Sequence, residues 1–190
     1  MTMDMIKNIT DYIDNQFASE LTAIIDEDAW VTDLKRRVQH HGYRYDYKAR
    51  SIDTRDALGP LPEPLAGLAR QLADDGIFAV PPDQVIVNEY LPGQGIAPHT
   101  DCIPCFGPVI ASLSLGSACT MRLTGPARNG QDRDETIDLR LHPGSLLVLS
   151  GDARYRWRHG IPARKSDMVD GVRVPRSRRV SLTFRTVLTS

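Results

Sequence analysis

The second half of the chain is a succession of short apolar segments separated by glycine and proline, and this pattern restricts the possible folds more than any other feature. Beyond Pro81 and Pro82, strands are expected at residues 84–90, 109–115, 120–123, 136–141, 145–150 and 179–188. The first half carries the helical periodicity. Helices followed by many short strands predict an α+β, mainly β protein, with a double-stranded β-helix (jelly-roll) core and N-terminal buttressing helices.

Two segments of the first half are expected to form those helices. One face of residues 19–29 is apolar, and Ser19 can cap the first turn. The second helix shows apolar residues at i, i+3, i+4 and i+7, namely Leu65, Leu68, Ala69 and Leu72. Gly76 stands where the C-cap of this second helix belongs.

The composition is that of an ordinary soluble globular protein, with 41% hydrophobic and 25% charged residues in a chain of 190. One domain spanning residues 1–190 is expected at this length. No apolar run approaches the ~20 residues that a membrane-spanning helix needs, and the acidic, polar N-terminus does not resemble a secretory signal. No conspicuous apolar stripe indicates an obligate partner, so we expect a monomer with no membrane contact.

The cysteines argue for a reducing compartment. The chain has three of them, an odd number that argues against a disulfide framework and suits a cytoplasmic protein. Cys102 and Cys105 form a C-x-x-C pair, but no second pair exists to complete a zinc site. Buried or incidental thiols are therefore expected.

The net charge of −1 conceals two basic regions, at residues 35–55 and 154–179. Two basic regions on a near-neutral protein indicate a local anionic partner. Solvated faces with paired charges would give the same composition, so either region taken alone leaves this alternative open.

Three tyrosines alternate within the first basic region. Tyr43, Tyr45 and Tyr47 have the spacing of a strand, which puts the three rings on one face. Because aromatic rings stack on bases and arginine binds phosphate, residues 34–55 could form a nucleotide-gripping lid. A hairpin whose tyrosine face simply covers the core explains the same pattern, and the residues alone do not decide between the two.

A second pattern indicates metal chemistry. His99 and Asp101 follow the strand at residues 84–90 after a Pro/Gly-rich turn, so both side chains can reach one point. His159 follows the strand at residues 145–150 and is the candidate for a third ligand, whereas His142 lies in an expected hairpin turn. Two histidines and one carboxylate form the facial triad of non-haem Fe(II) oxygenases. An isolated H-x-D is more often a pair of surface loop residues, and it gains weight here from the third ligand.

The last expected strand places four polar side chains on one face. They are Arg179, Ser181, Thr183 and Arg185, and the opposite face holds Val180, Leu182 and Phe184. Arginines on an interior face would need an anionic partner, and a bidentate arginine–carboxylate pair would hold a dicarboxylate. Periodicity alone favours the alternative, in which the apolar face is the core and the arginine face is solvated.

Taken together, the motifs resemble a known family. The segments NEY…PG.GI..H.D, SLSLGS, PGSLLVLSG..RY.W.HGI and RVSLTFR are closely similar to those of the AlkB family of Fe(II)/2-oxoglutarate dioxygenases, over about residues 30–188. Within the family, RRVQHHGYRYDY and RYRWRHGIPARKSD most resemble the AlkB-like domain of animal enzymes that hydroxylate the wobble uridine of tRNA. Ser181 stands where some bacterial DNA-repair members carry asparagine.

The resemblance implies a set of site residues and cofactors. Fe(II), 2-oxoglutarate as co-substrate and O2 would be used, and the implied iron ligands and catalytic residues are His99, Asp101 and His159. The residues implied for 2-oxoglutarate are Tyr90, Arg179 and Ser181 at its distal carboxylate, with Asn88 and Arg185 near its metal-chelating end. The residues implied for nucleic-acid recognition lie in the lid and are Arg36, Arg37, Tyr43, Tyr45 and Tyr47. The jelly-roll would span about residues 84–188.

The resemblance also implies the reaction. Oxidative dealkylation of N-methylated bases in DNA or RNA is expected first, with release of formaldehyde, succinate and CO2. The partner would be nucleic acid, because the base must be single-stranded or flipped out of its duplex to enter the pocket. The alternatives are hydroxylation of a tRNA wobble uridine and oxidation of a protein or a small molecule.

Overall fold

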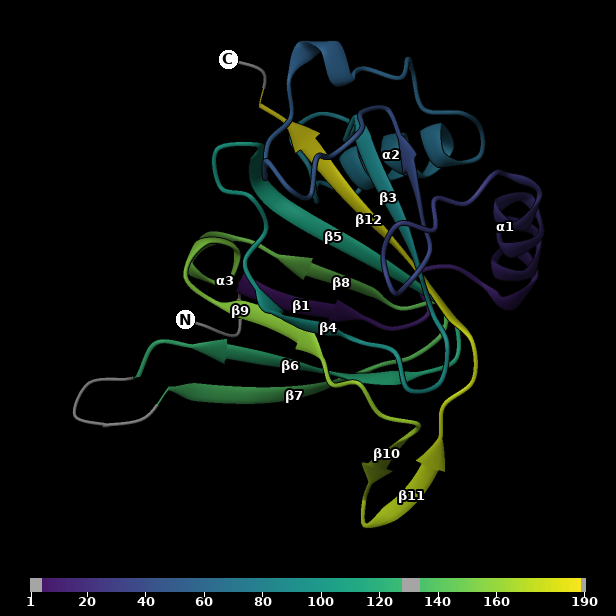
Figure 1. Ribbon diagram of the computed structural model, residues 1–190, viewed down its shortest axis with the longest axis vertical. Helices are drawn as coiled ribbons and strands as arrows, with labels where there is room; N and C mark the ends of the chain where they lie inside the picture. The colour runs from purple at the N-terminus through teal and green to yellow at the C-terminus, as the bar shows by residue number, and fades with distance from the viewer. Residues whose placement is uncertain (1–4, 128–133, 189–190) are drawn as a thin grey trace.

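Two antiparallel sheets of six and four strands form the body of the protein (Figure 1). The computed structural model describes residues 5–127 and 134–188, so the ends of the expected domain, residues 1–4 and 189–190, lie outside the described residues. The larger sheet has the order β1 (Ile6–Ile9), β8 (Leu146–Leu149), β5 (Phe106–Gly116), β12 (Arg179–Val187), β3 (Gln84–Tyr90) and β2 (Val38–His41). The smaller has the order β4 (Ile96–His99), β9 (Arg158–Ile161), β6 (Cys119–Gly125) and β7 (Glu135–Leu141). The mainly β prediction is therefore confirmed, and the strand expected at residues 84–90 coincides with β3.

Both faces of the larger sheet are buried. Along β8, Leu146 and Val148 pack into the core on the helix side, whereas Leu147 and Leu149 pack into the core between the two sheets. The helix-side core includes residues of α1 (Asn15–Glu27) and α2 (Leu65–Asp74). The helices thus buttress one face of the larger sheet, and the smaller sheet covers the other.

The ends of the two helices test the capping predictions. Gly76 adopts a positive φ of 70° just after α2, as a C-cap requires, so that prediction is confirmed. The Ser19 cap is wrong, because α1 begins four residues earlier at Asn15. Asp14 accepts a hydrogen bond of 2.7 Å from the Phe17 N–H and caps the helix instead. Ser19 lies inside the helix, where its hydroxyl donates to the Asn15 carbonyl.

The tyrosine-rich segment is not the continuous strand that its alternation predicts. Regular pairing with β3 ends at His41, and Tyr43 and Asp46 form only isolated bridges, to Ala57 and Ser51. The Asp46 carboxylate accepts hydrogen bonds from two backbone N–H groups just beyond it and closes a turn. The local turn therefore overrides the strand period.

The expectation of separate thiols at the C-x-x-C pair is also wrong. Cys102 and Cys105 are joined by a disulfide bond, and Cys119 is free and buried. The Cα atoms of the pair are 5.3 Å apart, a separation that a disulfide spans readily. An odd cysteine count excludes a framework that uses all cysteines, but it does not exclude one local pair.

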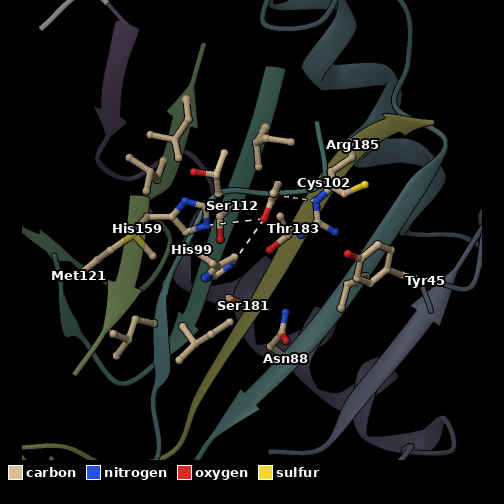
Figure 2. A pocket seen from close by; sticks show the side chains of 18 of the residues that line it. Tyr45, Asn88, His99, Cys102, Ser112, Met121, His159, Ser181, Thr183 and Arg185 are labelled. Carbon is tan, nitrogen blue, oxygen red and sulfur yellow. Dashed lines mark hydrogen bonds and ion pairs between the residues drawn. The ribbon is translucent and has the colours of Figure 1, made fainter. Parts of the chain in front are cut away.

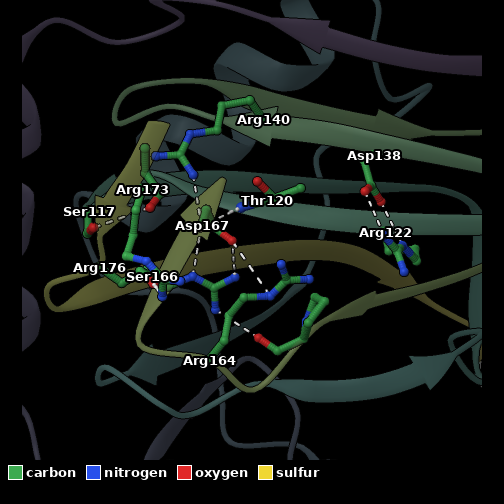
Figure 3. A network of polar contacts seen from close by, with 12 residues as sticks. Ser117, Thr120, Arg122, Asp138, Arg140, Arg164, Ser166, Asp167, Arg173 and Arg176 are labelled. Atoms are coloured by element: carbon green, nitrogen blue, oxygen red, sulfur yellow. Dashed lines mark hydrogen bonds and ion pairs between the residues drawn. The ribbon is translucent and has the colours of Figure 1, made fainter. Parts of the chain in front are cut away.

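A hairpin of β10 (Ser166–Val169) and β11 (Val172–Pro175) projects from one end of the molecule (Figure 1). Asp167 anchors it to the smaller sheet: its buried carboxylate accepts hydrogen bonds from Arg176 at 2.6 Å, Arg140 at 2.8 Å and the Thr120 N–H at 3.2 Å (Figure 3). Burial raises the pKa of Asp167, but the bonds from Arg176 outweigh this and hold the pKa below its ordinary value. Beyond these strands, α3 (Gly151–Tyr155) and a 3₁₀ turn (Thr54–Asp56) complete the fold, and no described helix has the length and apolarity to cross a bilayer.

We expect Asp167→Asn to destabilise the protein by about 3 kcal/mol, because it leaves two partly buried arginines without their carboxylate. Denaturant unfolding measures this, and Asp138→Asn is the matched control. Asp138 pairs with Arg122 on the surface, where both side chains are 46% exposed, so its loss should cost under ~1 kcal/mol. The folded-state pKa of Asp167 is lowered. Its contribution to the free energy of unfolding should therefore be complete above the unfolded-state pKa and disappear as the pH falls through the folded-state pKa. Equal losses for the two variants would contradict the anchoring role.

Candidate metal and co-substrate site

A cavity of about 360 Å³ lies between the two sheets and opens beneath the tyrosine-rich lid segment. Strands β3 and β12 contribute polar side chains from the larger sheet, and β4 and β9 contribute histidines from the smaller (Figure 2). The alternation of β12 explains its polar face: Val180, Leu182 and Phe184 pack toward the helices, so Arg179 and Arg185 must face the cavity. The arginine face is buried, and the interpretation of that face as solvated is wrong.

His99, Asp101 and His159 meet at one end of the cavity. His99 and His159 are directly paired across β4 and β9, and Asp101 follows β4 by two residues. One ligand atom from each of the three lies within 4.8 Å of the others. The Asp101 Oδ1 atom is 3.4 Å from Nε2 of His99 and 3.7 Å from Nε2 of His159. Two imidazoles and one carboxylate in this arrangement are a donor set suited to Fe(II), with positions left open on the metal.

The surroundings prepare each of the three as a ligand. Nδ1 of His99 lies 2.9 Å from the Ala97 carbonyl, to which it donates, so Nε2 keeps its lone pair for a metal. Burial lowers the pKa of His159 to about 4, so its imidazole is neutral at physiological pH. Burial would raise the pKa of Asp101, but the Arg185 guanidinium and the two histidines hold it well below its usual range. Nε of Arg185 donates to Oδ2 of Asp101 at 2.9 Å, which leaves Oδ1 on the side of the histidines.

Arg179 fits the other end of the co-substrate. The residue is 3% exposed, and its Nη2 donates to the Ser114 hydroxyl at 2.9 Å. Its Nε and Nη1 atoms are buried and have no hydrogen-bond partner among the described residues. Two unpaired donors in the fork of one guanidinium match a bidentate carboxylate, and such a partner would also offset the cost of burying the charge.

The remaining predicted residues divide into two groups. Asn88, Tyr90 and Ser181 line the same cavity, as do Arg36, Tyr45 and Tyr47 from the lid. Arg37 and Tyr43 do not line it.

Arg37 instead donates to both oxygens of the buried Glu89 and lies over the Trp30 ring, which makes it a structural residue. Tyr43 pairs with Ala57 outside the cavity. His142 is exposed, as expected, but its turn is not a hairpin, because it connects β7 of the smaller sheet to β8 of the larger.

Arg154 is a buried residue whose role was not predicted, since it was noted only within a basic region and within the motif PGSLLVLSG..RY.W.HGI. The residue is 2% exposed, and its guanidinium donates to the backbone carbonyls of Asp101, Cys102, Phe106 and Gly107 at 3.0–3.2 Å. It therefore holds the loop that begins with a metal ligand. The signal in the sequence was weak, because an arginine in a short helix of a basic segment usually faces solvent.

Comparison with known proteins identifies the family to which this protein belongs. The chain belongs to the 2OG-Fe(II) oxygenase superfamily, whose model matches residues 20–185. A protein of Acanthamoeba polyphaga mimivirus, itself uncharacterized, is 38% identical over 180 residues, or 95% of this chain and 83% of that protein. The "Alkylated DNA repair protein ALKBH8 homolog" of Arabidopsis thaliana is 36% identical over 197 residues, which covers 94% of this chain and 57% of that protein.

The "tRNA (carboxymethyluridine(34)-5-O)-methyltransferase alkbh8" of Xenopus tropicalis is 34% identical over 200 residues, but this chain spans only 31% of its length. These relatives place the chain in the AlkB family, as its motifs predict. The solved structure of OsALKBH1 superposes with a TM-score of 0.67 at 18% identity, over 96% of both chains, and confirms the jelly-roll fold. The protein is therefore an oxidoreductase that uses Fe(II), 2-oxoglutarate and O2.

For the metal, we expect Asp101→Ala to abolish both Mn(II) binding and succinate formation, since it removes the carboxylate ligand and leaves Arg185 unpaired. Calorimetric titration with Mn(II), a redox-stable probe, measures the first, and 2-oxoglutarate turnover measures the second. His142→Ala is the control and should retain both. If His142→Ala were the inactive variant, the choice of His159 as third ligand would be wrong.

For Arg154, we expect Arg154→Met to weaken Mn(II) binding about tenfold or more, because four carbonyls lose their donor and the Asp101 loop loosens. Arg156→Met, two residues along and 61% exposed at its side chain, should bind Mn(II) like the unaltered protein. Circular dichroism identifies a temperature at which every variant is folded. Titrations at that temperature separate the effect on Mn(II) binding from global unfolding. Unchanged Mn(II) affinity in Arg154→Met would contradict a positioning role.

Proposed function

We propose that this protein hydroxylates a neutral or anionic modified base in single-stranded or flipped-out nucleic acid, with a tRNA uridine as the first candidate. The observation that carries the proposal is the charge of the cavity. Asp101 supplies the only carboxylate among the described residues that line it, and four arginines line it as well: Arg36, Arg50, Arg179 and Arg185. Because Asp101 is a metal ligand, a cationic base would find no carboxylate partner there.

The names of the relatives support nucleic acid as the substrate class, and one of them carries a tRNA uridine in its name. The lid supports it too. Tyr45 and Phe106 present rings at the cavity with centroids 5.8 Å apart, and a base could stack on such walls. A protein or small-molecule substrate would not need this combination of rings and cations.

Each residue has a part in the proposed reaction. His99, Asp101 and His159 would hold iron, and Arg179 with Tyr90 and Ser181 would anchor the distal carboxylate of 2-oxoglutarate. Bound iron with 2-oxoglutarate and O2 supplies oxidation of a substrate C–H bond, coupled to decarboxylation of 2-oxoglutarate to succinate.

The protein contributes position and shielding. Arg185 keeps Asp101 ionised and oriented, and the apolar walls at Ile110 and Leu149 keep water from the metal end of the cavity.

Oxidative dealkylation of N-methylated bases is the second candidate, favoured by the repair activity in the name of the Arabidopsis relative. The oxidised N-methyl carbon would leave as formaldehyde. The charge of the cavity favours neutral methylated bases for this reaction, since a cationic methylated base would find no carboxylate besides the metal ligand Asp101 among the described lining residues.

The test is mass spectrometry of substrates after turnover with Fe(II), ascorbate, 2-oxoglutarate and O2. One pool contains N-methylated single-stranded DNA and RNA, and the other contains bulk tRNA. We expect a gain of one oxygen on a tRNA uridine with the first pool untouched. Loss of methyl from the first pool with release of formaldehyde would establish dealkylation instead, and loss from cationic bases would overturn the charge argument. Succinate without either product would direct the search to proteins and metabolites.

A further inference from the structure

The hydroxyl group of Tyr47 is buried without a hydrogen-bond partner among the described residues. The ring packs edge-on against Tyr45, with centroids 5.1 Å apart at an interplanar angle of 87°, and against His40 at 5.7 Å. Burial raises the pKa of the phenol, so the hydroxyl keeps its proton and is a donor. Buried hydroxyls are normally paired, and an unpaired one at the wall of a cavity indicates a ligand.

Tyr47 lines the same cavity as Arg36, Tyr90 and Arg179, and the charge of Arg36 acts on its phenol. Arg36, also from the lid side, donates from Nε to the Asn88 side chain at 2.9 Å. Its Cζ atom is 5.9 Å from the centre of the Tyr90 ring, and Cζ of Arg179 is 5.5 Å from the same centre. Two guanidinium groups, one from the segment before β2 and one from β12, therefore meet at one tyrosine.

The pairing of strands places these residues in one layer. Asn88 lies opposite Ser181, and Tyr90 lies opposite Arg179, in the register of β3 and β12. Arg36 is the only one of the lid arginines at residues 36–44 that lines the cavity, because Arg37 is bound to Glu89 and Arg44 faces solvent. The lid thus extends down to the strands that carry the unpaired donors of Arg179.

From this arrangement we propose that Tyr47 and Arg36 belong to the 2-oxoglutarate site rather than to the nucleic-acid site. The Tyr47 hydroxyl donates a hydrogen bond to a carboxylate of 2-oxoglutarate, and Arg36 supplies a second cation beside Arg179. The inference rests on the co-substrate of the family and on Arg179 as its proposed anchor, but not on which base is oxidised.

The proposed hydrogen bond would also connect the lid to the co-substrate. The turn that carries Tyr47 is fixed by Asp46, but regular strand pairing ends before it, so the segment has few backbone bonds to the sheet. A ligand that bonds to both Tyr47 and β12 would hold the lid over the cavity. Binding of 2-oxoglutarate would then stabilise the lid over the cavity, which is a coupling between the co-substrate and nucleic-acid sites.

The test compares Tyr47→Phe, which removes only the hydroxyl, with Tyr43→Phe, a lid tyrosine outside the cavity. Calorimetric titration of the Mn(II)-loaded proteins with 2-oxoglutarate gives Kd without turnover. We expect Kd to rise about tenfold or more for Tyr47→Phe, the loss of one hydrogen bond to a charged group, and to stay unchanged for Tyr43→Phe. Hydrogen–deuterium exchange should show that 2-oxoglutarate protects residues 36–50 in the unaltered protein and protects them less in Tyr47→Phe.

Arg179→Met separates this inference from the proposed function. Loss of 2-oxoglutarate binding in Arg179→Met together with unchanged binding in Tyr47→Phe would support the anchor and overturn the role of Tyr47. Unchanged 2-oxoglutarate affinity with weaker binding of single-stranded RNA in Tyr47→Phe would overturn the inference as well, since Tyr47 would then belong to the substrate. If Tyr47→Phe does not fold, Arg36→Gln decides: the proposal requires a raised Kd for 2-oxoglutarate, and an unchanged Kd refutes it.

Discussion

The ion pair between Arg185 and Asp101 connects the metal centre to the middle of the larger sheet. The two residues are 84 positions apart in the chain, both are buried, and one carboxylate oxygen is committed to the arginine while the other faces the histidines. A buried pair of this kind is costly unless its geometry is fixed by the fold around it. β12 provides that geometry, since it is hydrogen-bonded to β3 on one side and β5 on the other. The orientation of Asp101 therefore depends on the last strand, which links the metal site to the folding of the larger sheet.

The same strand explains how one protein has both an ordinary core and a polar cavity. Its apolar residues Val180, Leu182 and Phe184 pack against the helices, and its polar residues line the space beneath the smaller sheet. If this face of the sheet were exposed to solvent, water would hydrate the arginines and they would have little selectivity for an anion. Because the second sheet covers this face, Arg179 is buried with two donors unpaired, which is why we propose it as the site of a carboxylate.

Elements that depend on neighbouring residues were predictable from the sequence, whereas contacts between residues far apart in the chain were not. The bounds of β3 and the end of α2 follow from periodicity and turn residues that act over a few positions. The two histidines and the aspartate were recoverable from their motifs, although the strands β4 and β9 that contain His99 and His159 were not expected from the sequence. Arg37 and Arg154 were misjudged because both sit in basic segments, and only the tertiary fold brings one to Glu89 and the other to four carbonyls. The disulfide was not predicted for a similar reason. A C-x-x-C pair forms a disulfide bond only where the backbone brings its two Cβ atoms close together.

The lid shows why a run of charge does not define one surface. Its basic residues have three separate environments: Arg37 is bound to Glu89, Arg36 enters the cavity beside Tyr90, and Lys48 faces solvent. Only side chains of the third kind remain available to phosphate groups outside the cavity. Glu89 also accepts a hydrogen bond from Arg178, which in turn pairs with Asp26 of α1. Through Glu89, these contacts connect the start of the lid, at Arg37, to helix α1. If Tyr47 binds 2-oxoglutarate as we propose, the inner side of the lid responds to the co-substrate while Lys48 on its outer side stays exposed to solvent.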